Sequence, residues 1–574
     1  MKPSPLVVRA TNQYRRRDVL AYLGLRYYLE NSAARSDRWA REVATDLVTR
    51  RGEPCYLTVK HFKEVDSSGQ VTHREMFLPG PNEALAEAAL LDECAKLGGG
   101  FSPSEAVFSY RLAGDSDLSG VYQHYMHGLR QRHDAIAVAC KAAPDAVVLH
   151  LDIRRYYPSV TIPRANAAWL GAAEAQGMAR KWVEVGMHLL QDHARASAKR
   201  EGHLLTGPMF SHLVGNLLLR PVDRAMSQVP VGYFRYVDDI TLVGTDAQLA
   251  VAVETLKSSL DELGLSLHGQ ESAKWLKVAA KDWLAAEHDY VEPTRGNSWV
   301  SLIGDLKRLL VFAPELREPL LAELAEHQIR LPVPDYAAAA QERGYKTRLS
   351  ELLNAVWFRR VVRKPSIARI VGQAVELRRE YEVEASELLE RLVAADPFLV
   401  KRLLPKVRYR FGRLAYLGDL AELGRLADAA AKVPALKYQS AVARAVATGD
   451  VSEVMGLGLN AAQSVAQPLS MRTQQVFHNR PRLDQVGQQS LAVLRMNGLS
   501  VMGPEPDNEQ CQLLKFATFG VDREMMKGGE AFLREIACLH GLGDAPRHES
   551  ILSTAFDVAE DITFDALEQE HQSS

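Results

Sequence analysis

The stretch YFRYVDDITLVG, residues 233–244, places two adjacent carboxylates, Asp238 and Asp239, between two apolar runs. Neighbouring carboxylates repel each other, and each is costly to remove from water. The flanking runs are typical of strands, so the stretch predicts a β-hairpin whose turn carries the acidic pair. Aspartates are also common in ordinary turns, where they accept backbone hydrogen bonds. The pair therefore indicates either a simple turn or a charged functional site.

A third aspartate, Asp152, follows another apolar run in DAVVLHLDIRRYYPSV, residues 145–160. This run predicts a buried strand that ends at Asp152 and Ile153. If this strand and the hairpin are neighbours in one sheet, the three carboxylates converge at one sheet edge. Divalent cations can supply the countercharge for such a cluster, and hard oxygen ligands suit Mg²⁺. The sequence therefore predicts a two-metal site for nucleotidyl transfer.

The two acidic stretches resemble catalytic blocks of the reverse transcriptases. HLDIRRYYPSV (residues 150–160) looks like the first block of that family, with an aspartate, a paired aromatic and a serine. YVDD (residues 236–239) matches the third block. Two further blocks bring the similarity to roughly residues 70–280. The resemblance implies the fingers and palm of a right-hand polymerase.

The second and fourth blocks keep the order of the family. TGPMFSHLVGNLLL (residues 206–219) is similar to the second block, because Gly207, Ser211 and Asn216 keep its spacing. LGLSLHGQESAKW (residues 263–275) resembles the fourth block, a Leu-Gly-Leu segment followed by a lysine. Four blocks in this order favour a polymerase palm over a chance match.

The resemblance also implies a set of metal ligands. Asp152 and Asp238 would hold both ions, and Asp239 would complete the acidic cluster with a weaker role. The carbonyl oxygen of Ile153 would be a further ligand. The implied cofactor is Mg²⁺, with Mn²⁺ as the alternative. Lys274 is the candidate acid for the pyrophosphate leaving group, although three extra residues separate it from the position of the family's lysine.

Contacts with the substrate follow from the same resemblance. Tyr157 stands where the family places an aromatic ring under the sugar, and such a ring would clash with a 2′-hydroxyl and favour deoxynucleotides. Its alternative is an ordinary core aromatic. Gly207 and Ser211 would shape the floor under the nascent base pair. Asn216 either takes part in the site or only joins its helix to the palm.

Two arginines upstream of the palm are candidates for binding the incoming triphosphate. Arg111 lies in VFSYRL and Arg74 in REMFLPGP, and both stretches resemble degenerate fingers blocks. A guanidinium fork suits phosphate oxygens. Arg111 is the stronger candidate, and a surface salt bridge is the alternative for each.

The sequence departs from the reverse transcriptases in three respects. Leu205, Thr206 and Gly207 replace the Pro-Gln-Gly signature, which puts the positioning of a template base in doubt. SLIGDL (residues 301–306) matches a primer grip only loosely. The palm is not followed by an RNase H or endonuclease domain. Short amphipathic helices with Pro or Gly between them follow instead and predict an all-α HEAT-like array.

This combination is similar to the bacterial abortive-infection and unknown-group reverse transcriptases, which act against phage. These proteins join a palm-and-fingers core to HEAT-like helices, and several synthesise DNA without a template or start from a protein hydroxyl. The resemblance implies these behaviours as options. We therefore expect an α+β chain with N-terminal helices and fingers at residues 1–144, a palm at 145–294 and a helical array at 295–574.

The helical region contains two basic runs that can contact nucleic acid. Lys401–Arg413 has six basic residues in thirteen, and Phe358–Lys364 has four in seven. Interleaved aromatics can stack on the bases of a single-stranded product, and a solvated helix face with core aromatics is the alternative. Protein priming would need an exposed hydroxyl, and the sequence does not choose among the tyrosines of this region. They are Tyr336, Tyr345, Tyr381, Tyr409, Tyr416 and Tyr438.

Several local predictions concern secondary structure. Residues 11–50 predict helix, and residues 54–79 predict two strands joined by a turn. NEALAEAALLDECAKL predicts a helix with Asn82 as its N-cap. LSLHG (residues 265–269) predicts the start of a strand, and the polar stretch 467–490 predicts a long loop.

Composition limits the class of protein. With 574 residues, 47% of them hydrophobic and 24% charged, the chain is a globular protein of several domains. The net charge of −2 excludes a strong overall positive field, so contact with nucleic acid must rest on local basic patches. The five cysteines form no CxxC pair and predict reduced thiols rather than disulfides or a zinc site. Without a signal peptide or a membrane-spanning apolar run, a cytoplasmic location is expected.

Together these patterns predict a DNA polymerase of the reverse-transcriptase type that acts in antiphage defence. It would use dNTPs and work either without a template from a protein primer, or on an RNA template from a nucleic-acid primer. A non-catalytic nucleic-acid-binding scaffold on a polymerase-like fold is the alternative. Expected partners are dNTPs, single-stranded DNA product, RNA in the templated case and a second copy of the chain; no membrane partner is expected.

Overall fold

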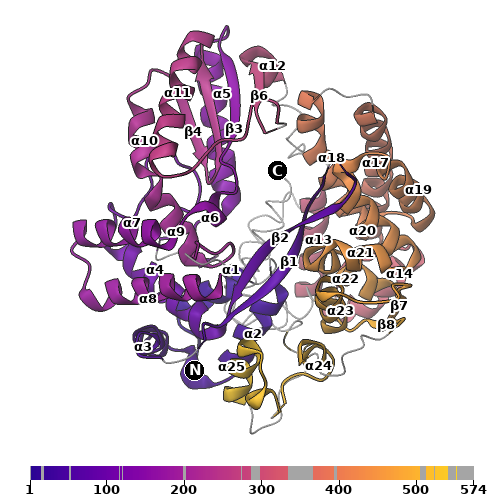
Figure 1. Ribbon diagram of the computed structural model, residues 1–574. Helices are drawn as coiled ribbons and strands as arrows, with labels where there is room; N and C mark the ends of the chain where they lie inside the picture. The colour runs from indigo at the N-terminus through magenta and orange to yellow at the C-terminus, as the bar shows by residue number, and fades with distance from the viewer. Residues whose placement is uncertain are drawn as a thin grey trace. The chain divides into compact units, whose positions relative to one another are not determined.

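The described part of the chain is a mixed α+β structure of many helices and three small sheets (Figure 1). It divides into two compact units. Unit 1 comprises Met1–Thr58, Met76–Tyr290 and Lys527–Leu539, and unit 2 comprises Val59–Glu75, Val291–Met526 and His540–Ser574. The computed structural model describes residues 2–14, 18–50, 53–66, 68–114, 117–118, 120–197, 202–272, 274–285, 298–333, 366–393, 397–504, 512–522, 524–540, 548 and 551.

Unit 1 begins with several short helices. Residues 11–50, predicted as one helical stretch, are divided by turns. The helices are α1 (Pro5–Tyr14), α2 (Val19–Leu29), the 3₁₀ helix η1 (Ser32–Arg35) and α3 (Asp37–Leu47). The side chain of Ser36 accepts a hydrogen bond from Trp39 N and so caps the first turn of α3. The helical state was predicted correctly, and the breaks were missed because local capping sets them.

A β-hairpin follows these helices. Strands β1 (Tyr56–Val65) and β2 (Val71–Pro79) pair in a two-stranded sheet, which confirms the two predicted strands. In the turn, Asp66 Oδ1 accepts hydrogen bonds from Ser68 N and Gln70 N. An aspartate that accepts from the backbone in this way stabilises a turn without help from the core.

Helix α4 (Pro81–Leu97) begins one residue before the predicted N-cap. Gly80 is the N-cap, and Pro81 occupies the first helical position, where a missing N–H does no harm. The prediction of Asn82 as N-cap is therefore wrong. Its side chain instead accepts a hydrogen bond of 2.6 Å from the hydroxyl of Tyr28.

The central element of unit 1 is a four-stranded antiparallel sheet. Its strands are β3 (Val147–Asp152), β4 (Gly232–Tyr236), β5 (Asp239–Gly244) and β6 (Leu276–Ala279). Their order is β4-β5-β3-β6, so the predicted strand before Asp152 and the predicted hairpin are direct neighbours. The strand predicted at residues 265–269 does not form. Leu267 makes only an isolated bridge with Ile153.

Helices cover both faces of this sheet. In β5 every residue after Asp239 is buried, and α5 and α11 both pack on this strand. α11 starts with a capping box in which Gln248 N donates to the Thr245 side chain and Thr245 N donates to the Gln248 side chain. Burial on both faces explains why the strands read as continuous apolar runs.

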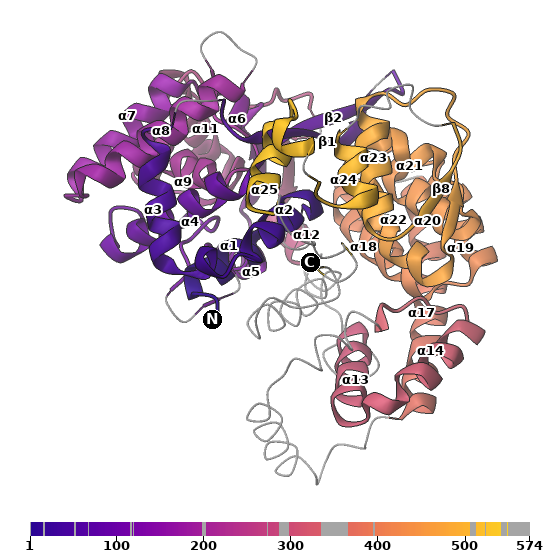
Figure 2. The same cartoon turned by 90° about the horizontal axis from the view of Figure 1, so that it is seen from below.

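The remaining helices of unit 1 surround this core. They are α5 (Tyr125–Ala142), α6 (Tyr156–Ser159), α7 (Ile162–Ala175), α8 (Arg180–Ala196), α9 (Met209–Leu218), α10 (Arg220–Ser227), α11 (Asp246–Glu262), α12 (Ala280–Ala285) and α25 (Ala531–His540). α25 comes from the last fifty residues of the chain and lies beside α2 (Figure 2). A Cβ at Gly24 of α2 would lie 2.9 Å from Phe532 Cζ, so the two helices approach closely at this glycine.

Unit 2 is largely helical. Its elements are α13 (Trp299–Phe312), η3 (Pro314–Leu316), α14 (Arg317–Glu326), α17 (Ile367–Val393), α18 (Pro397–Leu417), α19 (Leu420–Ala430), η4 (Pro434–Leu436), α20 (Lys437–Thr448), α21 (Ser452–Leu457), α22 (Leu459–Arg472), β7 (Gln475–Phe477), α23 (Gln485–Met496), β8 (Ser500–Met502), α24 (Gln512–Phe519) and η5 (Glu524–Lys527). Helices that follow one another pack together, as in α17 with α18 and α19 with α20. None of the helices described in either unit has the length and apolar character that crossing a membrane requires.

Residues 467–490 are not the long loop that their polarity predicts. They complete α22, form β7 and begin α23. β7 pairs in parallel with β8, with Val476 opposite Val501. The Asp484 side chain accepts from Gly487 N at the start of α23. Polar residues in this stretch cap a helix and lie in a short strand. Its apolar residues repeat over too few positions for the sequence to predict a helix or a strand.

Candidate active site

The three predicted catalytic aspartates gather at one end of the β3–β5 pair. Asp152, the last residue of β3, lies opposite Asp239, the first residue of β5. Asp238 stands in the turn just before β5, and its carbonyl oxygen accepts a hydrogen bond of 3.0 Å from Ile153 N. Asp152 is 7% exposed, Asp238 is half-buried and Asp239 is exposed. The sheet register therefore brings together residues that lie far apart in the sequence.

The turn that carries Asp238 has an unfavourable backbone conformation. Tyr236 pairs with Asp239, which leaves Val237 and Asp238 as a two-residue turn. Val237 has φ of +56°, a value that costs a β-branched residue roughly 1–3 kcal/mol. Two-residue hairpins usually use Asn or Gly at such positions. Strain of this kind persists only where the surroundings enforce it, and it is concentrated at functional sites.

A buried hydrogen-bond network enforces this conformation. Val237 N donates to Ser109 Oγ at 2.8 Å, and Val237 O accepts from Arg235 Nη1 at 3.0 Å. Arg235 is 1% exposed and forms a two-pronged ion pair with Asp223, at 2.8 and 2.7 Å. Asn216 accepts from Arg235 Nη1 and donates to Ser109 O. Asn216 thus joins α9 to the hairpin, which is the structural one of its two predicted roles.

Lys274 contacts the acidic cluster directly. Its Nζ donates to Asp152 Oδ2 at 2.8 Å, although the side chain remains half-exposed. Burial alone would lower the pKa of this lysine. The hydrogen bond to Asp152 and the charges of the adjacent acidic pair outweigh burial and raise that pKa. The structure therefore places a protonated ammonium group where sequence similarity put a candidate acid.

A second cation, Arg132 of α5, lies against the strand that begins with Asp239. Its Nη2 donates to Thr241 Oγ1 at 2.7 Å, on the strand that begins with Asp239. Burial lowers the pKa of Arg132, and the charge of Asp239 opposes this shift. The side chain was not singled out in the sequence because it lies in a helix, remote from the acidic motifs.

The three aspartates do not form a tight ligand group by themselves. Their carboxylate oxygens are not among the groups of three ligand atoms that, in the described residues, lie within 4.8 Å of one another. Oxygen ligands on a partly exposed sheet edge are the chemistry that Mg²⁺ or Mn²⁺ prefers.

Tyr157 stands in an aromatic cluster next to the site. Its hydroxyl is 2.6 Å from His212 Nδ1, and the ring of Tyr110 stacks on His212 with centroids 3.8 Å apart. Burial raises the pKa of Tyr157, so the hydroxyl stays neutral. Tyr156 is fully buried and donates to Gly215 O at 2.6 Å. Of the paired aromatics, Tyr156 belongs to the core and Tyr157 is half-buried.

Gly207 and Ser211, predicted to form a floor under the nascent base pair, are both buried. Ser211 is fully buried in α9. Gly207 is buried with φ of +125°, and a Cβ there would lie 2.6 Å from Phe77 O. The neighbouring Thr206 O accepts from Phe77 N at 2.8 Å. This glycine is required by the close approach of two backbones.

Replacing Gly207 by alanine is expected to lower the free energy of unfolding by about 2 kcal/mol, because the backbone is strained and the Phe77 carbonyl cannot move aside cheaply. Chemical denaturation measures this loss. Gly171→Ala is the matched control, since Gly171 lies in α7 with no atom within 4 Å of its added Cβ. That control should stabilise the protein by about 0.5–1 kcal/mol. Equal effects of the two substitutions would contradict the steric argument.

The predicted triphosphate ligands are placed differently from each other. Arg111 Nε and Nη2 donate to Val107 O at 3.1 and 2.9 Å, and Nη1 donates to Gln131 Oε1 at 3.2 Å. The guanidinium thus supports the loop that carries Val107, which makes a parallel bridge with Arg235 of β4. Arg74 is exposed on β2.

The basic run Lys401–Arg413 is divided between interior and surface, with Arg410 and Arg413 buried and Arg408 exposed. Arg410 is 5% exposed, donates to Glu384 Oε2 at 2.5 Å and lies over the ring of Tyr381. Arg413 is 9% exposed and stacks on Trp299. These cations therefore hold helices of unit 2 together, which is closer to the alternative interpretation than to a nucleic-acid surface. The second run, Phe358–Lys364, lies outside the described residues.

The residues that support the hairpin were missed in the sequence, although one signal was present. Tyr233 and Arg235 alternate with more exposed residues in β4, so both point to the buried side. A buried arginine needs an acidic partner. Asp223 in RPVDRAM is the nearest upstream aspartate, and its pairing with Arg235 could have been inferred.

In comparisons with known proteins, no protein-family model and no curated protein matches the chain.

Proposed function

We propose that this protein is a nucleotidyltransferase of the reverse-transcriptase type, which polymerises dNTPs at Asp152, Asp238 and Asp239 and acts in antiphage defence. The observation that carries the proposal is the register of β3 and β5, in which Asp152 lies opposite Asp239. The acidic residues come from two strands and a strained turn. An aspartate that only stabilises a turn would not need to meet a carboxylate from another strand.

The strain in the turn supports the same proposal. Val237 is held at φ of +56° by Ser109 and Arg235, which is a costly way to close a hairpin. The cost is explained if the position of the Asp238 carboxylate matters more than the stability of the turn. Divalent ions held by these carboxylates would activate the attacking oxygen and stabilise the leaving one.

The residues around the aspartates have separate roles in this proposal. Lys274 carries a proton next to Asp152 and would donate it to, or neutralise, the pyrophosphate group. The ring of the half-buried Tyr157 would select against a 2′-hydroxyl. Its contact with His212 fixes the direction of the ring. The four-stranded antiparallel sheet, on which α5 and α11 pack, would serve as the palm in this proposal.

The helical unit would guide the product or supply a primer, as a HEAT-like array. Of the candidate priming tyrosines, Tyr336 and Tyr345 lie outside the described residues. Tyr381 is 1% exposed, and the hydroxyl of Tyr438 donates to Asn460 O at 2.9 Å. Tyr409 and Tyr416 are half-buried. Tyr381 is therefore the least suitable primer of those described.

The test is incorporation of labelled dNTPs by the full chain with Mg²⁺ or Mn²⁺, with and without added RNA, followed by sequencing of the product. The wild-type protein should incorporate nucleotides, and the Asp238→Ala/Asp239→Ala variant should not. A product that copies the added RNA would establish templated synthesis and rule out the untemplated form. Label that stays on the polypeptide after nuclease digestion would establish protein priming.

The scaffold alternative makes the opposite prediction. If equal incorporation is measured for the wild type and the double variant, these aspartates do not catalyse polymerisation. If the double variant keeps full protection against phage although wild-type protein incorporates dNTPs, the biological role does not need catalysis. Circular dichroism of both proteins separates either result from misfolding.

A further inference from the structure

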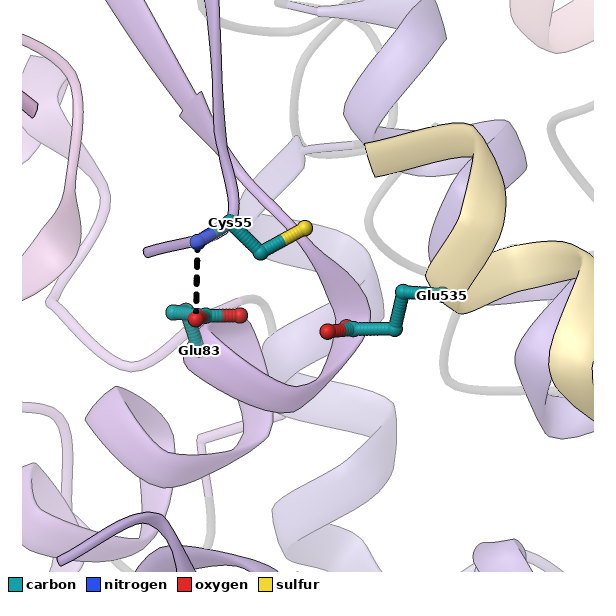
Figure 3. Close-up of side chains that lie close together, drawn as sticks. All are labelled: Cys55, Glu83 and Glu535. Carbon is teal, nitrogen blue, oxygen red and sulfur yellow. Dashed lines mark hydrogen bonds between the residues drawn. The ribbon is translucent and has the colours of Figure 1, made fainter. Parts of the chain in front are cut away.

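A second group of potential metal ligands lies in unit 1, formed by Cys55, Glu83 and Glu535 (Figure 3). Cys55 immediately precedes β1, Glu83 is in the first turn of α4 and Glu535 is on α25. The thiol sulfur and one oxygen of each carboxylate all lie within 4.8 Å of one another. Within the residues that the structure describes, this is the one group of three that meets this distance.

The backbone around the group holds all three side chains in place. Cys55 N donates to Glu83 Oε1 at 3.1 Å, and Asn82 N donates to Glu535 Oε1 at 2.7 Å. Gly80 N donates to Cys55 O at 2.7 Å. A Cβ on Gly80 would lie 2.3 Å from Cys55 Sγ and 2.9 Å from Glu535 Oε1. A side chain at position 80 would thus fill the space that these groups share.

One carboxylate oxygen in this space lacks a partner. Glu83 is fully buried, and its Oε1 is used by Cys55 N and by the guanidinium of Arg50. Glu83 Oε2 has no hydrogen-bond partner among the described residues. Figure 3 shows that this second oxygen points toward the carboxylate of Glu535. A buried carboxylate oxygen without a donor is costly, and a bound ion is a common explanation for one.

Among the described residues, one guanidinium is shared by several acidic side chains here. Arg50 contacts Glu83, lies 3.7 Å from Glu535 Oε2 and lies 4.0 Å from Asp192 Oδ2. One guanidinium therefore serves three acidic side chains. The thiol of Cys55 is free of any disulfide and is buried. A cation in the shared space would neutralise the remaining charge.

We propose that Cys55, Glu83 and Glu535 bind one divalent transition-metal ion, with Zn²⁺ the best match. A thiolate with two carboxylates suits Zn²⁺, whereas Mg²⁺ binds oxygen ligands. Bonds of about 2.3 Å to sulfur and about 2.0–2.2 Å to oxygen would draw the three groups in around the ion. A water molecule takes the fourth position. As the metal–sulfur bond forms, the Cys55 thiol releases its proton to solvent.

This ion would link the C-terminal part of the chain to the N-terminal part within unit 1. Cys55 and Glu83 lie in the first hundred residues, and Glu535 lies on α25. Arg50 would remain on Glu83 Oε1 and orient that carboxylate. The binding free energy of the ion would then contribute to holding α25 in place, because the three ligands meet only in the folded unit.

The test is the metal content of the full chain, purified without a polyhistidine tag from zinc-supplemented cells, by mass spectrometry of the elements. About one Zn²⁺ per chain is expected. Replacing Zn²⁺ with Co²⁺ should give a thiolate-to-cobalt absorption band in the near ultraviolet. Cys55→Ser should abolish that band, and Glu535→Gln, which keeps an acceptor for Asn82 N, should weaken affinity by about tenfold or more.

Two controls separate this site from other effects. Cys94→Ser removes a second buried thiol, on α4 and outside the group, and should leave the cobalt band unchanged. Asp152→Asn, in the proposed catalytic cluster, should also leave the band unchanged. Absence of stoichiometric metal, together with no rise in melting temperature of the metal-free chain on adding Zn²⁺ or Co²⁺, would overturn the proposal. If Cys55→Ser does not fold, the same titration of Glu535→Gln decides.

Discussion

Replacing Asp152 by asparagine is expected to reduce dNTP incorporation by about 10³-fold or more, with little loss of stability. Asp152 is the buried member of the acidic cluster and lies opposite Asp239 in the sheet. Asparagine keeps an oxygen that accepts the hydrogen bond from Lys274, so the fold should tolerate it. What is lost is the negative charge that holds divalent ions. Steady-state incorporation with saturating Mg²⁺ measures the effect, and thermal melting checks the fold.

The chain offers a matched control for this substitution. Asp246, at the start of α11, forms an ion pair of 2.7 Å with Lys277 of β6, much as Asp152 does with Lys274. Unlike Asp152, Asp246 is exposed, and so is its partner Lys277. Asp246→Asn should leave incorporation unchanged. A rate for Asp152→Asn within tenfold of wild type would contradict a catalytic role. Asp239→Asn should give an intermediate loss of incorporation, because the charge of this exposed carboxylate is more strongly screened by solvent.

The sheet that carries the aspartates was predictable because its signals are local. The apolar run before Asp152 and the runs on either side of Asp238 each mark a strand by composition alone. That these strands are neighbours could be expected only on the assumption that they belong to one sheet. The structure has them in adjacent strands. The chemical role of the aspartates stays a prediction, since geometry alone does not test it.

Apart from the Arg235–Asp223 pair, the support of the site could not be predicted, because it depends on contacts across the fold. Ser109 comes from a loop and Asn216 from α9, and their meeting at Val237 and Arg235 has no periodic signature. The same holds for Cys55 and Glu535, whose separation in sequence gave no reason to expect a metal site. Long-range pairs of this kind are determined by topology.

The charge-rich stretch of α18 is divided between the interior and the surface. Lys401–Arg413 looked like a surface for nucleic acid because six cations lie close together in sequence. In α18 the side chains point around a helix, so Arg410 and Arg413 reach the interior and bind Glu384 and Trp299 there. A basic run on a helix of an all-α region therefore indicates helix packing as readily as a ligand surface.

Replacing Arg235 by methionine is expected to lower the free energy of unfolding by about 3–5 kcal/mol. Arg235 is fully buried, and the carboxylate of Asp223 keeps the pKa of this guanidinium raised in spite of burial. Removing the cation leaves Asp223 buried with the hydroxyl of Tyr233, at 2.8 Å, as its one side-chain donor within the described part of the chain. Chemical denaturation measures the loss. Arg180→Met, which removes an exposed pair with Glu184, should cost less than about 0.5 kcal/mol.

The double variant Arg235→Met/Asp223→Leu separates stability from positioning of the catalytic turn. It removes both charges, so much of the lost stability should return. Incorporation should stay low, because Val237 O and Asn216 Oδ1 still lack the donor that Arg235 supplies, and the strained turn is free to relax. The Asp238 carboxylate would then leave its place beside Asp152. Full recovery of both stability and incorporation would show that Arg235 contributes to folding alone, and a loss below about 1 kcal/mol in the single variant would contradict the buried-pair argument itself.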